Sequence, residues 1–288
     1  MTTLVRRAAA LCALAASSVA LAACGSTGPG HAPRPAPSAP SATASEAAPS
    51  RPPTLAPGPA GLTPVFEHGP RADGRTVALT FDADMTADQG PRAAAGERFD
   101  NPGLIATLRK LEVPATVFMT GRWAEEYPDA ARSIGRDPRF EIANHSYSHY
   151  AFTDDCYGLP TVPEERMRSD VEQAYAAFRE AGVPDPMPYF RFPGGCHDKA
   201  ALKALTAAGV TAVQWDVVSG DAFATDADAV ARQVLDGVQP GSVVVMHCTR
   251  SAAPVTEEAV RKIVPELRRQ GYRFVKVSEL IGAANGRR

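Results

Sequence analysis

From about Val65 onward, short runs of β-type residues alternate with segments of helical periodicity. Seven runs rich in branched and aromatic residues are Thr76–Phe81, Ala115–Met119, Phe140–Asn144, Tyr189–Phe192, Thr211–Trp215, Ser242–Met246 and Arg273–Val277. The helical segments between most of them are Gly103–Leu111, Ala124–Ile134, Glu164–Glu180, Asp198–Ala208, Asp226–Asp236 and Thr256–Arg269. This alternation predicts an α/β domain with a parallel sheet covered by helices. Seven repeats in one domain favour a barrel. In such barrels the active-site residues follow the carboxyl ends of the strands.

The N-terminus has the character of a targeting signal. Arg6 and Arg7 precede an apolar stretch from Ala8 to Ala23, which is too short and too rich in alanine for a permanent membrane span. The stretch ends in Leu21-Ala22-Ala23-Cys24, which resembles the lipobox of bacterial lipoproteins. We expect residues 1–23 to be a signal peptide and Cys24 to carry lipid. The alternative is an ordinary signal peptide, and both readings predict an exported protein.

Residues 24–62 are dominated by Pro, Ala, Ser and Gly. Such a segment cannot bury enough apolar surface to offset the entropy lost on ordering, and its prolines favour a semi-extended spacer. We expect it to tether a catalytic domain, residues 63–288, to a lipid anchor at the outer face of the cell membrane.

The charge balance argues against nucleic-acid binding, and the cysteines predict a disulfide. The 30 basic and 32 acidic residues nearly cancel, so no basic surface for nucleic acid is indicated. In an oxidising compartment one disulfide is expected among the cysteines after Cys24. Cys156 and Cys196 lie in segments punctuated by glycine and proline, whereas Cys248 follows a strand. We favour the pair Cys156–Cys196, because loops meet the strict geometry of a bridge more easily.

Several candidate catalytic residues follow the predicted strands. The first strand runs into Asp82-Ala83-Asp84, where a carboxylate after a buried run needs a partner or a metal, although aspartate is also common in turns. His145 and His149, four residues apart after the third strand, favour a metal site, since neutral imidazole is a common ligand. They lack the glutamate of an H-E-x-x-H metalloprotease helix.

The later strands contribute further polar groups. Arg191 begins the segment Arg191-Phe192-Pro193-Gly194-Gly195, and an arginine at a strand end needs a carboxylate partner. Trp215 ends the fifth predicted strand and Asp221 follows it. His247 follows Ser242–Met246, where it can donate a proton or only cap the strand.

Together these segments resemble the polysaccharide deacetylase family, which includes chitin, peptidoglycan and nodulation-oligosaccharide deacetylases. The resemblance extends from about Arg75 to Leu280 and rests on five ordered motifs: Thr80-Phe81-Asp82-Ala83-Asp84, His145-Ser146-Tyr147-Ser148-His149, Arg191-Phe192-Pro193-Gly194, Trp215 through Asp221, and Val244-Val245-Met246-His247. It implies a distorted (β/α)7 barrel and hydrolysis of N-acetyl groups on amino sugars.

The resemblance also implies a role for each matching residue. Asp82 corresponds to the catalytic base that deprotonates the attacking water, and Arg191 to the residue that orients it. His145 and His149 correspond to ligands of a divalent metal, usually zinc. His247 corresponds to the general acid, tuned by Asp221. The backbone N–H of Gly194, beside Pro193, corresponds to the oxyanion donor, and Trp215 to part of the substrate-binding surface.

The sequence departs from the family pattern at the metal site and the substrate groove. The family has two adjacent aspartates, the second of which binds metal, but here Ala83 takes that place and Asp84 the next. Either Asp84 reaches the metal through a shifted loop, or the site uses the two histidines with water and substrate. Val218 and Ala222-Phe223 also replace residues that are common in the family.

Three alternatives remain open from the sequence. One is a non-catalytic carbohydrate-binding relative, favoured by Ala83 but not by the retention of Asp82 and His247. Another is a hydrolase acting on a different acetylated substrate, such as xylan. The third is a calcium loop at Asp82–Gly90, whose spacing does not match an EF-hand. We expect a monomer that acts on peptidoglycan amino sugars, with chitin oligomers or an exopolysaccharide as the other substrates considered.

Overall fold

The computed structural model describes residues 51–286, so the predicted signal peptide and Cys24 lie outside the described residues. The strands of this part are β1 Val65–Phe66, β2 Thr76–Ala83, β3 Ala115–Met119, β4 Phe140–Asn144, β5 Tyr189–Phe190, β6 Thr211–Val213, β7 Val217–Val218, β8 Ser242–His247 and β9 Arg273–Phe274. They form one sheet in the order β1-β6-β5-β4-β3-β2-β8-β7, with β9 paired to β2, and every pair is parallel.

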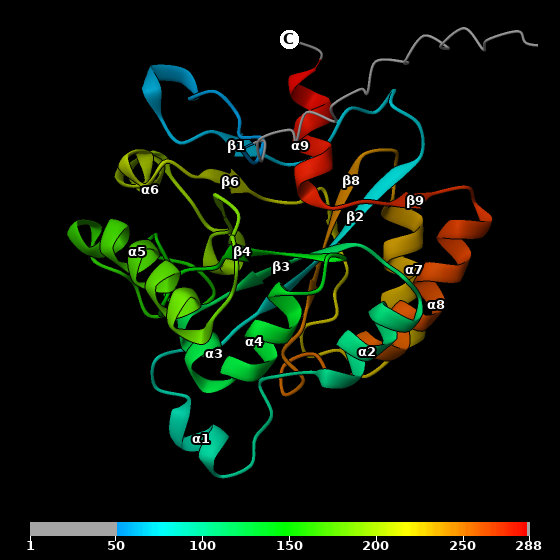
Figure 1. Ribbon diagram of the computed structural model, residues 1–288, viewed down its shortest axis with the longest axis horizontal. Helices are drawn as coiled ribbons and strands as arrows, with labels where there is room; N and C mark the ends of the chain where they lie inside the picture. The colour runs from blue at the N-terminus through cyan, green and yellow to red at the C-terminus, as the bar shows by residue number, and fades with distance from the viewer. Residues whose placement is uncertain (1–50, 287–288) are drawn as a thin grey trace, which may run out of the picture. The chain divides into compact units, whose positions relative to one another are not determined.

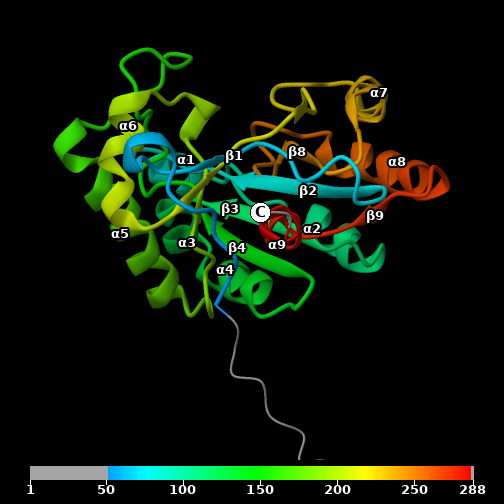
Figure 2. The same cartoon turned by 90° about the horizontal axis from the view of Figure 1, so that it is seen from above.

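Helices surround this sheet, and the last of them packs Val277, Leu280 and Ile281 against the apolar cluster on the inner face of the sheet. The helices are α1 Gly90–Ala94, α2 Pro102–Lys110, α3 Gly121–Glu126, α4 Pro128–Gly135, α5 Glu164–Ala181, α6 Lys199–Ala204, α7 Ala227–Gly237, α8 Thr256–Arg269 and α9 Val277–Asn285, with 3-10 turns at Pro59–Gly61, Pro193–Gly195 and Thr206–Ala208. In Figures 1 and 2, α5 and α6 lie on one side of the strands, and α7 and α8 lie on the opposite side. None of the helices within residues 51–286 is both long and apolar enough to span a bilayer.

The sheet curls into a barrel that is not closed by hydrogen bonds. Its path ends at β1 beside β6 on one side and at β7 on the other. The chain passes from β6 to β7 through only Gln214, Trp215 and Asp216, so these two strands lie near each other across the seam. The predicted distorted barrel of parallel strands and helices is therefore confirmed.

Alternation along the central strand β2 determines what faces the barrel interior. All of its residues are buried, as expected for a parallel strand covered on both faces. One face of β2 packs into the apolar core shared with the helices, through Val77, Leu79, Phe81 and Ala83. On the other face, Ala78 belongs to a second apolar cluster with Phe118, Tyr189 and Val213. Because side chains alternate, Thr80 and Asp82 face the interior with Ala78.

Several predicted boundaries differ from the structure. The helix predicted over Ala124–Ile134 is two helices, because Pro128 lacks a backbone N–H and begins α4 instead of continuing α3. The strand predicted over Arg273–Val277 ends at Phe274, and Val277 begins α9, which the sequence analysis missed. The strand predicted over Thr211–Trp215 ends at Val213, and β1, β7 and α1 were not predicted.

The end of the predicted tether lies against the folded domain. The Leu55 N–H donates to Thr211 Oγ1 at 3.2 Å, and the Tyr189 hydroxyl donates to the Pro53 carbonyl at 2.7 Å. Leu55 also packs against the apolar cluster inside the barrel. Pro53 and Leu55, which the sequence analysis assigned to the tether, therefore contact the folded domain.

Truncation of a core side chain tests the packing of α8 against the sheet. Ile263→Ala removes a fully buried side chain and should lower the free energy of unfolding by about 2–5 kcal/mol, measured by urea denaturation. Glu258→Ala on the exposed face of the same helix is the matched control and should change it by less than about 0.5 kcal/mol. Equal effects of the two substitutions would contradict this packing.

Candidate active site

A buried ion pair lies inside the barrel, where β2 and β5 end. The Arg191 guanidinium has no solvent exposure, and its Nη1 donates to Asp82 Oδ1 at 2.7 Å and to Thr80 Oγ1 at 2.8 Å. Its Nε donates to the Val213 carbonyl at 3.2 Å, and its carbon lies 3.9 Å from the centroid of the Phe118 ring. Burial alone would raise the pKa of Asp82, but Arg191 foremost lowers it, so this carboxylate is ionised.

Two histidines follow β4 beside this pair. His145 Nδ1 donates to the Arg191 carbonyl at 2.9 Å, which leaves Nε2 facing the carboxylates. That Nε2 lies 3.6 Å from Asp82 Oδ2 and 3.5 Å from Asp84 Oδ1, and His149 Nε2 lies 3.9 Å from the same Asp84 oxygen. Ser146 and His149 both adopt left-handed backbone conformations, with φ of 71° and 56°, and so turn the chain back after β4.

Asp84, His145 and His149 can hold a metal ion. One ligand atom from each lies within 4.8 Å of the other two. Asp84 Oδ1 is buried and has no hydrogen-bond partner among residues 51–286, which is the condition that a bound cation would relieve. Burial lowers the pKa of His145, and it lowers the pKa of His149 to about 4, so both rings are neutral at neutral pH and can bind metal. Burial also raises the pKa of Asp84, a shift that a bound cation would oppose.

The position of Asp84 has a simple origin in β2. Ala83 is fully buried and belongs to the core shared with the helices, so a carboxylate at that position would point away from the histidines. Asp84 returns to the side of Asp82, and its backbone N–H is held by Thr249 Oγ1 at 2.9 Å. The structure thus brings Asp84 beside His145 and His149, where it can act as a third ligand.

His247 and Asp221 form a second pair next to the first. β8 pairs with β2 so that His247 stands opposite Asp82 in register. His247 Nδ1 donates to Asp221 Oδ1 at 2.8 Å, and Asp221 also accepts from the Ser219 and Thr256 hydroxyls. Burial opposes a charge on His247, but the Asp221 hydrogen bond and charge outweigh it and raise the pKa of His247 to about 10. His247 is therefore a charged proton donor at neutral pH.

The segment after β5 borders this site. Pro193 is buried, and Gly194 and Gly195 have left-handed φ values of 65° and 75°. A Cβ on Gly195 would lie 2.4 Å from the Trp215 ring, so only glycine fits there. The structure joins Cys156 to Cys196 in a disulfide and leaves Cys248 buried as a free thiol.

The sequence analysis missed the residues that support the predicted ones. The Thr80 hydroxyl accepts from Arg191, and the Ser219 and Thr256 hydroxyls donate to Asp221. The ring of Phe118 packs against the Arg191 guanidinium. Isolated threonine and serine residues in strands, loops and helix ends give no pattern that could have identified them. Only Thr80, two residues before Asp82 on the same face of a predicted strand, carried such a signal.

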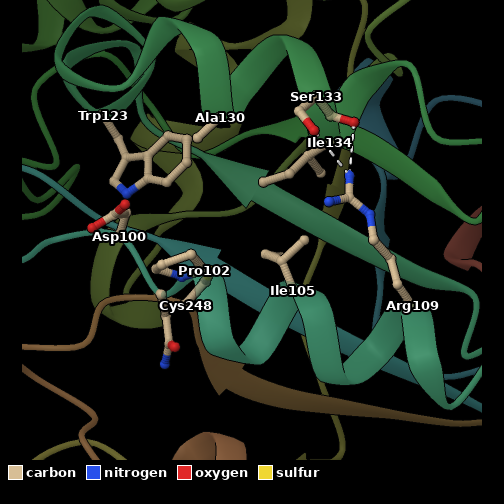
Figure 3. Close-up of a pocket in the computed structure, with 10 residues that line it drawn as sticks. Asp100, Pro102, Ile105, Arg109, Trp123, Ala130, Ser133, Ile134 and Cys248 are labelled. Carbon is tan, nitrogen blue, oxygen red and sulfur yellow. Dashed lines mark hydrogen bonds between the residues drawn. The ribbon is translucent and has the colours of Figure 1, made fainter. Parts of the chain in front are cut away.

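A separate cavity of about 180 Å³ lies outside the barrel. Figure 3 shows Ile105 and Arg109 of α2 facing Ala130, Ser133 and Ile134 of α4, with Trp123 and Cys248 at one end. Its lining includes none of the metal-site residues, and Cys248 belongs to the core shared with the helices. This cavity is therefore distinct from the site around Asp82.

Comparisons with known proteins identify relatives of this chain. Residues 69–213 match the family described as polysaccharide deacetylase. A peptidoglycan-N-acetylglucosamine deacetylase of Bacillus cereus is 28% identical over 72% of this chain and 88% of its own length. A chitooligosaccharide deacetylase of Bradyrhizobium sp. is 27% identical over 74% of this chain and 94% of its own. A crystal structure of a peptidoglycan N-acetylglucosamine deacetylase superimposes with a TM-score of 0.63 at 28% identity, covering 76% of this chain and 92% of that one.

The raised pKa of His247 predicts a pH-dependent contribution to stability. A group whose pKa is higher in the folded state stabilises the fold fully below its unfolded value of 6.5, and this contribution is lost as the pH rises through about 10. Chelator-treated wild type should therefore exceed His247→Gln in unfolding free energy by a margin that shrinks between pH 6.5 and 10. Denaturant titrations at several pH values measure it, and a margin independent of pH would refute the ion pair.

Proposed function

Because the chain belongs to the polysaccharide deacetylase family, we propose that it is a metal-dependent hydrolase that removes N-acetyl groups from amino sugars of a polysaccharide. The observation that carries this proposal is the convergence of three metal-ligating side chains, an ionised carboxylate and a charged histidine within one barrel mouth. With a bound metal ion, these parts are sufficient to hydrolyse an unactivated amide without a covalent nucleophile.

The residues divide the proton transfers between them. Asp84, His145 and His149 would hold a divalent ion, for which we propose zinc, and this ion would supply a Lewis acid that lowers the pKa of water and polarises the amide carbonyl. Asp82, ionised and oriented by Arg191, accepts the proton of the attacking water. His247, protonated and held by Asp221, donates a proton to the departing amine. The backbone N–H of Gly194 is the donor that we propose for the oxyanion.

We propose the amino sugars of peptidoglycan as the substrate. The support is the named activity of the Bacillus cereus relative and the expected export of this chain, which would place the enzyme next to the cell wall. Chitin oligomers are the second candidate, since the Bradyrhizobium relative is a chitooligosaccharide deacetylase. Acetate release from peptidoglycan, from chitin oligomers and from acetylated xylan distinguishes the two deacetylase activities from each other and from the esterase alternative.

A non-catalytic sugar-binding role is less well supported by the same residues. Binding alone gives no reason to keep a buried, ionised Asp82 or a His247 whose charge is maintained by Asp221, because both groups are costly to bury. Acetate release by the purified protein distinguishes the two roles.

We predict that removal of the metal abolishes acetate release. A chelator should stop release from acetylated oligosaccharides, and zinc or cobalt should restore it, as measured by an enzymatic acetate assay. Release that is unaffected by a chelator would contradict the metal role.

Substitutions should separate the base from the metal ligands. Asp82→Asn should lower kcat by about 10²–10⁴-fold with metal content retained, since general bases contribute rate enhancements of this size. His145→Ala and Asp84→Ala should lose both bound metal and turnover, measured by metal analysis and acetate release. Glu180→Gln, an exposed carboxylate on α5, is the control and should behave as wild type. Full metal content in Asp84→Ala would show that another group is the third ligand.

We further propose that residues 1–23 are removed and that the mature protein is held to the outer face of the membrane by lipid on Cys24. Cys24→Ala should shift the protein from the membrane fraction to the medium. Immunoblotting of cell fractions and labelling with a fatty-acid analogue measure this shift. Membrane retention of the unlabelled variant would contradict lipid anchoring.

A further inference from the structure

Tyr157 is unusually exposed for an aromatic residue. Within residues 51–286, the large apolar side chains open to solvent are Tyr157, with 86% of its surface exposed, Phe223 and Val218. Tyr157 also has a left-handed backbone, with φ of 53°, which is unfavourable for a residue other than glycine. Folding gains nothing from holding an exposed ring in a strained conformation, so the arrangement needs another explanation.

The loop that carries Tyr157 is firmly held at both ends and at its tip. Ala151 and Thr161 form a β-bridge, and the Val162 N–H donates to the Ala151 carbonyl at 2.8 Å. Phe152 is buried against Phe190 and Phe192. The Cys156–Cys196 disulfide links the residue before Tyr157 to the segment after β5. Tyr157 is therefore presented on a fixed support.

The Tyr157 ring lies directly beside Gly194, in the segment after β5. A Cβ built on Gly194 would lie 2.6 Å from Cys156 Sγ and 3.3 Å from Tyr157 Cδ2. Gly194 is three residues from Arg191, whose carbonyl orients His145 and whose side chain orients Asp82. Because the backbone N–H of Gly194 is the proposed oxyanion donor, the exposed Tyr157 ring lies next to the place proposed for the reacting acetyl group.

We propose that Tyr157 is a stacking surface for the sugar ring next to the one that is deacetylated. This inference rests on the proposed function, which supplies a chain of linked sugars that extends beyond the reacting acetyl group. One face of a pyranose ring carries mostly C–H groups, which pack on an aromatic face, while its hydroxyls stay in water and the tyrosine hydroxyl can bond to them. The free protein leaves this ring exposed because its partner is the substrate.

Chain length provides the test. Tyr157→Ala should lower kcat/KM for the β-1,4-linked N-acetylglucosamine tetramer about tenfold relative to its value for the single sugar, through a raised KM, because only the tetramer reaches the ring. Tyr157→Phe keeps the aromatic face and should retain most of the preference for the tetramer. Glu180→Gln is the control for handling and folding. A ratio of tetramer to single-sugar kcat/KM that is the same in Tyr157→Ala and wild type would overturn the proposal.

A binding measurement separates this inference from the proposed function. Calorimetric titration of the tetramer into Asp82→Asn and into Asp82→Asn/Tyr157→Ala should show about tenfold weaker binding by the double variant. If wild type releases no acetate from any sugar, the proposed function fails, while weaker tetramer binding by the double variant still supports the sugar subsite. Equal affinities of the two variants would reject the subsite whatever the activity.

Discussion

The buried pair of Arg191 and Asp82 is the interaction on which the site depends. A guanidinium with no solvent exposure is costly to desolvate, and the cost is offset because the group donates to Asp82, to Thr80 and to carbonyls at the end of β6. Arg191 acts twice, since its side chain fixes the carboxylate of Asp82 and its carbonyl fixes the ring of His145. Removing either charge would leave the other unpaired inside the barrel, a loss of about 3–5 kcal/mol by comparison with other buried pairs.

Histidines of opposite protonation state lie within this one site. His145 and His149 are neutral because burial disfavours their charged forms more than the nearby carboxylates favour them. His247 is charged because Asp221 bonds directly to its Nδ1 and is itself held by hydroxyls and by the His247 backbone N–H. A metal ligand and a proton donor need these opposite states, and the hydrogen bond and charge of Asp221, with smaller contributions from Asp84 and Asp82, account for the charged state of His247.

The alternation of strand-type and helix-type segments was enough to predict the fold class. The polar residues that follow the strands were enough to predict most of the candidate site. β3 and β4 have the predicted bounds because their β-branched and apolar runs are interrupted by polar or glycine-containing segments on both sides. The strands β1 and β7, of two residues each, have no period to detect, and α9 begins where a run of apolar residues suited a strand equally well. The place of Asp84 could not be settled from the sequence, because it depends on which face of β2 is covered by helices. The supporting contacts of Thr256 and Phe118 join residues that are far apart in the chain.

The disulfide between Cys156 and Cys196 has a consequence beyond the loop that it holds. It closes a ring with a sequence separation of 40 residues, and that ring contains all of α5, β5 and Arg191. In the chain-entropy account, a covalent ring of this size restricts the unfolded chain enough to favour the native state by about 4 kcal/mol. Reduction would therefore lower the stability of the whole fold, including the segment that carries Arg191, and production of the intact protein calls for an oxidising compartment.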